Sequence, residues 1–188
     1  IIPPFDDVRD ALQLKWSSRG FECTAQENQV RQRAVSSLRR FYDWEIQQGR
    51  EILEVERRFE LPIGDHTLVG RIDCVARRPD GTIEILDYKS GNRRSTTKIE
   101  ATKQLALYHL AWTHERMDSD PTTTLLFLGH DKETWSMTHT PESVTNSREM
   151  ILGVADNILN NRFATTTDPR ACRRCEFRHC CEGASRDA

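Results

Sequence analysis

The chain has 188 residues, enough for one domain of ordinary size with its own buried core. Hydrophobic residues make up 37% of the chain and charged residues 30%, which excludes a disordered protein, and no apolar run approaches the ~20 residues of a membrane-spanning helix. The net charge of −2 excludes nucleic-acid binding by bulk attraction, so any such binding must come from local basic patches.

The cysteines and the start of the chain bear on where the protein works. Four of the six cysteines lie between Cys172 and Cys181, whereas a secreted disulfide scaffold would spread them along the chain. The chain begins with Ile-Ile-Pro-Pro, without an initiator methionine and without a basic segment followed by an apolar one. We therefore expect a cytoplasmic protein with no membrane partner, and a fragment of a longer protein.

The N-terminal part is predicted to be helical. Val8, Leu12 and Trp16 are spaced to share one face of a helix, and a break follows at residues 17–20. A second helix is predicted from Gln26 to Gln48.

After Gly49 the apolar pattern changes from the period of a helix to that of a strand. Strands are predicted over Ile52–Leu61, Leu68–Ala76 and Thr82–Tyr88. The first turn includes His66, and Pro79-Asp80-Gly81 forms the second as a tight hairpin.

The second half alternates between helix and strand. A helix is predicted from Lys98 or Ala101 to Arg116, then a buried strand over residues 122–129 and a short edge strand over 134–139. The last helix begins at Pro141 and ends near Asn161, and the tail that follows has no regular period.

This order of elements predicts an α/β fold with a mixed central sheet, a crossover helix and flanking helices. We expect one domain over residues 1–188. It comprises a helical N-terminal part (1–49), a core (50–163) and a cysteine-rich C-terminal tail (164–188).

Two carboxylates flank the predicted hairpin turn. Asp73 lies seven residues before Asp80 and Asp87 seven residues after it, so they face one another if the hairpin closes there. Such a pair can hold one Mg²⁺ or Mn²⁺ with open positions for water and phosphate, and the main-chain carbonyl of Tyr88 is a further candidate ligand. Lys89 lies on the same face as Asp87, where it could orient the attacking water. Each residue alone is commonly just solvated, but together they favour metal-dependent phosphodiester hydrolysis.

Polar and basic residues follow this motif. Gln104 and Tyr108 are four apart and share one helix face, where they could bind a phosphate or support the nucleophile, although Tyr108 could also be a core aromatic with its hydroxyl at the surface. Basic residues that could contact a single DNA strand, or simply be solvated, are Arg93, Arg94, Lys98 and Lys103. A second candidate patch in the tail consists of Arg170, Arg173, Arg174 and Arg178.

These motifs resemble a known family. Gly-Arg-Ile-Asp ending at Asp73, Asp-Tyr-Lys-Ser-Gly starting at Asp87, and Gln104 with Tyr108 resemble the RecB-like nuclease branch of the PD-(D/E)XK superfamily. More narrowly, the chain resembles the nuclease domain at the C-terminus of UvrD/Rep-type helicases and of related helicase-nucleases that process double-strand breaks. The resemblance covers residues 50–185 well and the N-terminal helices loosely.

The resemblance implies a restriction-endonuclease-like core and a divalent-metal-dependent deoxyribonuclease that acts on single-stranded DNA or DNA ends in repair and recombination. Its implied partners are DNA and the helicase domains of a parent protein. It makes Asp73 and Asp87 metal ligands and Lys89 the catalytic lysine, with Gln104 and Tyr108 supporting the site.

The chain also departs from the family pattern. Members often have a glutamate on the first strand, which Glu56 matches, and usually have a histidine on a helix upstream of that strand, whereas the first histidine here is His66. A catalytically weak or inactive DNA-binding module of a helicase is therefore the alternative. No role is assigned to His109, His114, His130 and His139, because their spacing is not that of ligands.

The tail resembles the C-terminal part of the iron–sulfur staple of many RecB-like nucleases. Cys172 and Cys175 are separated by two residues, and Cys181 follows after five more, which implies a 4Fe-4S cluster. A fourth ligand is not evident, since Cys23 is the upstream candidate and its surroundings do not match the motif. The alternatives to the cluster are a zinc site formed by His179 with three cysteines, or free thiols.

Overall fold

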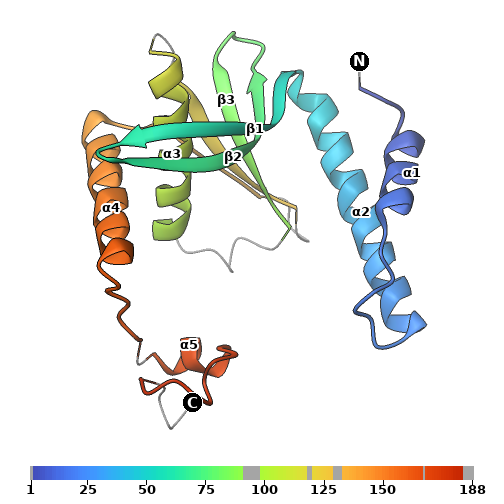
Figure 1. Ribbon diagram of the computed structural model, residues 1–188. Helices are drawn as coiled ribbons and strands as arrows, with labels where there is room; N and C mark the ends of the chain where they lie inside the picture. The colour runs from blue at the N-terminus through green and yellow to red at the C-terminus, as the bar shows by residue number, and fades with distance from the viewer. Residues whose placement is uncertain (1, 91–97, 118–119, 129–132, 167, 184–188) are drawn as a thin grey trace. The chain divides into compact units, whose positions relative to one another are not determined.

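The computed structural model describes residues 2–90, 98–117, 120–128, 133–166 and 168–183, and their side chains except at residues 98–101 and 133 (Figure 1). Its elements begin and end within two residues of the predicted bounds, apart from one short helix in the tail. No helix of the described residues is long and apolar enough to cross a membrane.

Two helices precede the sheet, α1 over Phe5–Lys15 and α2 over Thr24–Gln48. They pack against each other, with the ring of Phe5 edge-on to that of Tyr42 at 5.4 Å between centroids. Gly49 ends α2 with a φ of 60°, a left-handed conformation that glycine adopts without strain.

The sheet has five strands in the order β1-β2-β3-β4-β5. Pairing is antiparallel except between β3 and β4, which are parallel and are joined by the crossover helix α3 over Lys98–Glu115. The strands are β1 Glu51–Ile63, β2 His66–Arg77, β3 Ile83–Lys89, β4 Thr122–Phe127 and β5 Glu133–Met137. The predicted α/β class with a mixed, flanked sheet is confirmed, whereas His66 begins β2 instead of lying in the turn.

Alternation along β3 sends its side chains to two faces, and each face meets a different helix. On one face the ring of Tyr88 lies edge-on to Phe41 of α2, with 5.5 Å between centroids. On the other face Asp87 meets α3. Figure 1 shows the long β1–β2 hairpin extending across α3, and Phe59 of β1 contacts Tyr108 of α3 there. The helices therefore attach to opposite faces of β3, and the predicted active-site residues gather under α3.

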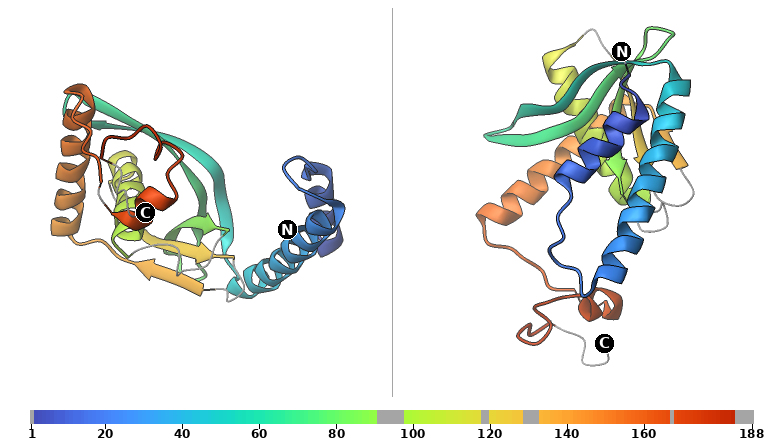
Figure 2. Two further views of the ribbon diagram at one scale, coloured as in Figure 1. Left: turned by 90° about the horizontal axis from the view of Figure 1, so that it is seen from below. Right: turned by 90° about the vertical axis from the view of Figure 1, so that its right-hand side faces the viewer.

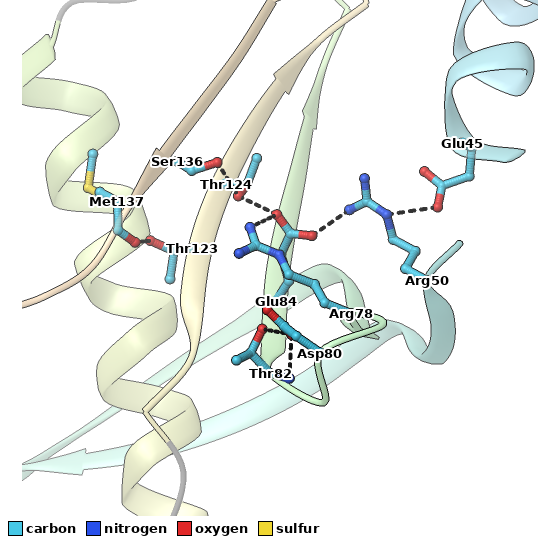
Figure 3. Close-up of polar contacts among 10 residues, drawn as sticks. All are labelled: Glu45, Arg50, Arg78, Asp80, Thr82, Glu84, Thr123, Thr124, Ser136 and Met137. Atoms are coloured by element: carbon cyan, nitrogen blue, oxygen red, sulfur yellow. Dashed lines mark hydrogen bonds and ion pairs between the residues drawn. The ribbon is translucent and has the colours of Figure 1, made fainter. Parts of the chain in front are cut away.

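A buried charge network joins the end of α2 to the sheet (Figure 3). The carboxylate of Glu84 accepts hydrogen bonds from Arg50 at 2.7 Å, from Arg78 at 2.6 Å and from Thr124 at 2.7 Å. Arg50 also pairs with Glu45 of α2 at 3.0 Å, and its side chain is 3% exposed. Burial raises the pKa of Glu84, but the hydrogen bonds from Arg78 and Thr124 outweigh it and leave that pKa below its usual value. The network therefore stabilises the charged form of Glu84.

By its contacts the chain divides into two compact units, Ile1–Arg148 and Glu149–Ala188. Helix α4 spans Pro141–Leu159, and the second unit also contains α5 over Pro169–Arg173. The sequence predicts an irregular tail, so α5 was not expected. Asp168 accepts a hydrogen bond from the Arg170 N–H, and Pro169 lies in the first turn, where proline fits a helix. These two residues explain why a helix forms in so short a segment.

Two buried histidines, His109 of α3 and His139 after β5, lie together beside the start of β4. Their ring centroids are 4.7 Å apart. His139 Nε2 is 2.8 Å from the hydroxyl of Thr123, and His109 Nε2 is 2.8 Å from a carboxylate oxygen of Asp120. Burial lowers the pKa of His139 to about 4, and the neighbouring His109 adds to the shift while Asp120 opposes it. His139 is therefore neutral in the folded protein near neutral pH.

His139 is expected to make stability fall as the solution becomes acidic. Its folded-state pKa lies below the unfolded value of 6.5, so the unfolded chain takes up the proton first as the pH falls. The contribution is complete above the unfolded pKa and is lost toward pH 4, by about 2 kcal/mol between pH 7 and pH 5. Urea unfolding of His139→Gln at both pH values should show a flatter dependence than wild type. His114→Gln, at an exposed histidine, is the control. An unchanged dependence in His139→Gln would contradict the assignment.

Candidate active site

Asp73 and Asp87 lie where the β2–β3 ladder ends. The last paired residues there are Cys74 and Leu86, and one further step in this register aligns Asp73 with Asp87 on the face that meets α3. Beyond the end of the ladder, the side chain of Asp73 bonds to the β3 backbone: its Oδ2 accepts a hydrogen bond from the Tyr88 N–H at 2.9 Å. The structure therefore brings the two carboxylates to the same end of the hairpin, as the turn at residues 79–81 predicted.

Asp87 is 2% exposed, and three side chains converge on it. Gln104 Nε2 and the Tyr108 hydroxyl donate to its Oδ1 at 2.8 and 3.1 Å, and Gln104 Nε2 also lies 3.0 Å from the Tyr108 hydroxyl. Lys89 Nζ forms an ion pair with Oδ2 at 2.7 Å. The alternative for Tyr108 was a core aromatic residue with its hydroxyl at the surface. Its ring is buried, but its hydroxyl donates to Asp87.

Opposed charges tune this cluster. Burial raises the pKa of Asp87, the ammonium of Lys89 lowers it, and the carboxylate of Asp73 raises it again, with a net shift upward. Burial and the charge of Asp87 also raise the pKa of Tyr108, so its hydroxyl stays protonated and can donate. The site thus holds two neighbouring carboxylates and one ammonium, which pairs with Asp87. This is a surplus of negative charge that a bound cation would compensate.

The glycine of the first motif has a packing role. Gly70 is paired with Phe59 on β1, and a Cβ added at Gly70 would overlap the Phe59 ring. That ring in turn lies edge-on to Tyr108, with 6.3 Å between centroids. Gly70 therefore leaves room for the ring that packs against a hydrogen-bond donor of Asp87. The role of Phe59 was not predicted from the sequence. The signal was Gly70, three residues before Asp73 on β2 and opposite a large aromatic residue on β1.

The oxygen atoms present suit a small divalent cation. Asp73 and Asp87 supply carboxylates, and the Tyr88 N–H points toward Asp73. In an extended strand the carbonyl of a residue points to the same side as its N–H, so the Tyr88 carbonyl faces Asp73 too. Oxygen donors of this kind are those that Mg²⁺ and Mn²⁺ take. Over the described ranges no three His, Cys, Asp or Glu side chains group closely enough to hold a metal ion. The Asp73 and Asp87 carboxylates and the Tyr88 carbonyl stay the predicted ligands.

Glu56 stands apart from this donor set. It has a φ of 51°, uncommon for a residue other than glycine, and it lies in β1 near the level of Asp73. Its carboxylate is exposed and pairs with Arg71 at 3.0 Å. The glutamate that matched the family pattern is therefore engaged by an arginine in this structure.

Comparison with known proteins places this site in a family. The family model described as the PD-(D/E)XK nuclease superfamily matches residues 3–182. The chain belongs to the PD-(D/E)XK nuclease superfamily. No curated protein matches it in sequence.

Two solved structures resemble this PD-(D/E)XK domain. The protein SSO0001 is 14% identical with a TM-score of 0.49, and the match covers 95% of each chain. A candidate exonuclease from Eubacterium rectale is 12% identical with a TM-score of 0.47, and the match covers 93% of this chain and 67% of that one. The assignment to the superfamily depends on the family match and not on these structural similarities.

PD-(D/E)XK nucleases generally use divalent metal ions, and a nuclease domain implies DNA binding. Of the basic residues predicted to contact DNA, Lys103 is exposed on α3 directly before Gln104. Arg93 and Arg94 lie outside the described residues, as does the side chain of Lys98. These DNA contacts therefore stay predictions.

The cysteines of the tail form no disulfide among the described residues. Cys172 is buried and its Sγ lies 3.7 Å from the carbonyl of Thr166, Cys175 is exposed and Cys181 is half-buried. Within the described part of the tail they do not join a group able to hold a metal. The 4Fe-4S cluster stays a prediction that depends on the resemblance.

Proposed function

We propose that this chain is a divalent-metal-dependent deoxyribonuclease of the RecB-like branch that hydrolyses phosphodiester bonds in single-stranded DNA or at DNA ends. The proposal includes helicase domains as partners and a role in DNA repair or recombination. One observation carries it: Lys89, Gln104 and Tyr108, from β3 and α3, all contact Asp87. Asp73 and Asp87 both lie one step beyond the last pair of the β2–β3 ladder, Cys74 and Leu86.

Each side chain has a distinct role in this proposal. Asp73 and Asp87, with the Tyr88 carbonyl, would hold Mg²⁺ or Mn²⁺. A bound ion of this kind supplies Lewis-acid stabilisation of phosphate charge and makes a coordinated water more acidic. Gln104 and Tyr108 fix the orientation of Asp87 through its Oδ1.

Lys89 is the residue that can act on the reacting groups. Its side chain is 30% exposed, so the ammonium reaches solvent while it stays paired with Asp87 Oδ2. From there it can donate a hydrogen bond to an attacking water and offset the negative charge that develops on the phosphate.

Cleavage of end-labelled single-stranded DNA is expected with Mg²⁺ or Mn²⁺ and absent with EDTA. Lys89→Met should lower kcat by about 10²-fold or more, because the charge-stabilising donor is lost. DNA binding should remain. The exposed Lys15 of α1 provides the matched control, and Lys15→Met should cleave at the wild-type rate. Full activity of Lys89→Met would remove Lys89 from the mechanism.

The second candidate is a helicase-associated DNA-binding module with weak or no catalysis. The small donor set favours it, since two carboxylates are the acidic side chains at the site in the described part of the chain. This candidate predicts DNA binding that survives Asp73→Ala and no cleavage with any divalent ion. Wild-type protein that binds DNA and leaves it intact in both Mg²⁺ and Mn²⁺ would favour this candidate over the nuclease.

A further inference from the structure

Three arginines of the Glu149–Ala188 unit gather around one hollow. Arg170, Arg173 and Arg174 are the described residues that line it, and its volume is about 310 Å³. They belong to α5 and to the residue that ends it, shown in red-orange in Figure 2. Arg173 and Arg174 follow Arg170 by three and four residues, so each of them neighbours Arg170 on the surface of that turn. We call these three residues the arginine cluster.

What sets the arginine cluster apart is that its three members share one hollow and none of them forms an ion pair with a carboxylate among the described residues. Exposed arginines elsewhere commonly pair with carboxylates, as Arg71 does with Glu56 at 3.0 Å and Arg77 with Glu51 at 2.7 Å. In the described residues no carboxylate forms an ion pair with any member of the cluster, and all three are exposed. Three positive charges thus face a common hollow, and no carboxylate of the described residues pairs with them.

The local structure holds the cluster in this arrangement. Asp168, the acidic residue next to it in sequence, uses its Oδ1 to accept the Arg170 N–H at 2.9 Å and so begins the helix. Cys172, between the members of the cluster, is buried with 5% exposure and anchors the turn on its other side. Asp168 thus caps the backbone and does not pair with the Arg170 guanidinium, which leaves that group available for a ligand.

We propose that the arginine cluster binds the phosphate backbone of single-stranded DNA, as a contact additional to the active site. This inference rests on the proposed function, since it takes the substrate strand as the ligand. Guanidinium groups offer planar pairs of N–H donors that match phosphate oxygens, and they keep their charge at any physiological pH. A hollow lined by three of them suits adjacent phosphates of a flexible strand better than it suits a neutral ligand.

The test measures binding without cleavage. The probe is fluorescein-labelled oligo(dT), titrated in EDTA with the full chain and followed by fluorescence anisotropy at several salt concentrations. The variant is Arg170→Gln/Arg173→Gln/Arg174→Gln. It should raise Kd by about tenfold and lower the slope of log Kd against log salt by about 2, as three lost phosphate contacts require. Arg170→Lys/Arg173→Lys/Arg174→Lys keeps the charge and should keep most of the slope.

The matched control removes three other arginines, each paired with a carboxylate, so the net charge falls by the same amount. It is Arg9→Gln/Arg39→Gln/Arg77→Gln. A cluster variant whose Kd and slope equal those of this control would overturn the inference, as would a lysine variant that loses as much as the glutamine variant. Failure of the wild-type chain to bind oligo(dT) would count against the proposed function itself. Wild-type binding and cleavage with an unaffected cluster variant would count against the arginine cluster alone.

Discussion

Asp87→Asn is expected to lower the rate of DNA cleavage by about 10³-fold while the protein stays folded. A neutral amide lacks the negative charge with which the carboxylate would hold a divalent ion. Its NH₂ group would face either the donors Gln104 and Tyr108 or the Lys89 ammonium. Gel analysis of end-labelled single-stranded DNA with Mg²⁺ measures the effect directly.

The thermal midpoint of Asp87→Asn distinguishes a loss of catalysis from a loss of folded protein. Burial and the nearby Asp73 hold the folded-state pKa of Asp87 above its unfolded value, so its charge opposes folding once the pH rises through that window. At pH 7 the asparagine variant lacks this cost, although it also loses the ion pair with Lys89. Its thermal midpoint should therefore match or exceed that of wild type. Asp43→Asn, at an exposed carboxylate paired with Arg39, should change neither property. Retained cleavage in Asp87→Asn would mean that the metal is held elsewhere.

Glu84→Ala is expected to destabilise the fold by about 3–5 kcal/mol, because it removes one of the two anions paired with the buried Arg50 and the acceptor of Arg78 and Thr124. In a domain of this size that loss corresponds to a fall in Tm of roughly 10 °C. The effect should be largest at neutral pH. Since the pKa of Glu84 is held below its unfolded value, the stability that Glu84 contributes is present above the unfolded pKa and is lost as the pH falls through the folded one. Urea unfolding followed by circular dichroism measures the loss.

Two comparisons isolate the buried charge as the cause. Glu51→Ala removes an exposed glutamate paired with Arg77 and should cost less than about 1 kcal/mol. The double variant Glu84→Ala/Arg50→Met removes both charges and should recover part of the loss. Equal losses for Glu84→Ala and Glu51→Ala would show that the network contributes no more than a surface pair.

The grouping of the site residues was predictable because each motif carries its own geometry. The turn at residues 79–81 fixes the register of the hairpin and so aligns Asp73 with Asp87. The spacing of four between Gln104 and Tyr108 fixes their common helix face. These relations depend on a few neighbouring residues, and the structure keeps all of them.

The partners of Glu84 could not be predicted in the same way. Arg50 is 34 residues from Glu84 along the chain and Thr124 is 40 residues from it. The alternation in β3 shows that Glu84 and Asp87 lie on opposite faces, but it does not say which helix covers which face. The contact between His109 and His139 escaped prediction for the same reason, since it joins α3 to the residues after β5.

The backbone conformation of Glu56 was also not predicted, for a different reason. The apolar pattern of the first strand predicts regular extended backbone, whereas Glu56 has a left-handed φ of 51° within β1. The spacing of apolar residues indicates which side chains are buried. It does not reveal a residue at an exposed position whose backbone is not extended.

A substitution at Gly70 can disturb the packing around the site without changing any catalytic side chain. Gly70 contributes no functional group, and its value lies in the space it leaves for the Phe59 ring beside Tyr108. A methyl group placed there displaces a ring and leaves every carboxylate and the lysine in the chain. Gly70→Ala is thus a natural starting point for a temperature-sensitive allele, in which warming alone would switch cleavage off inside a cell.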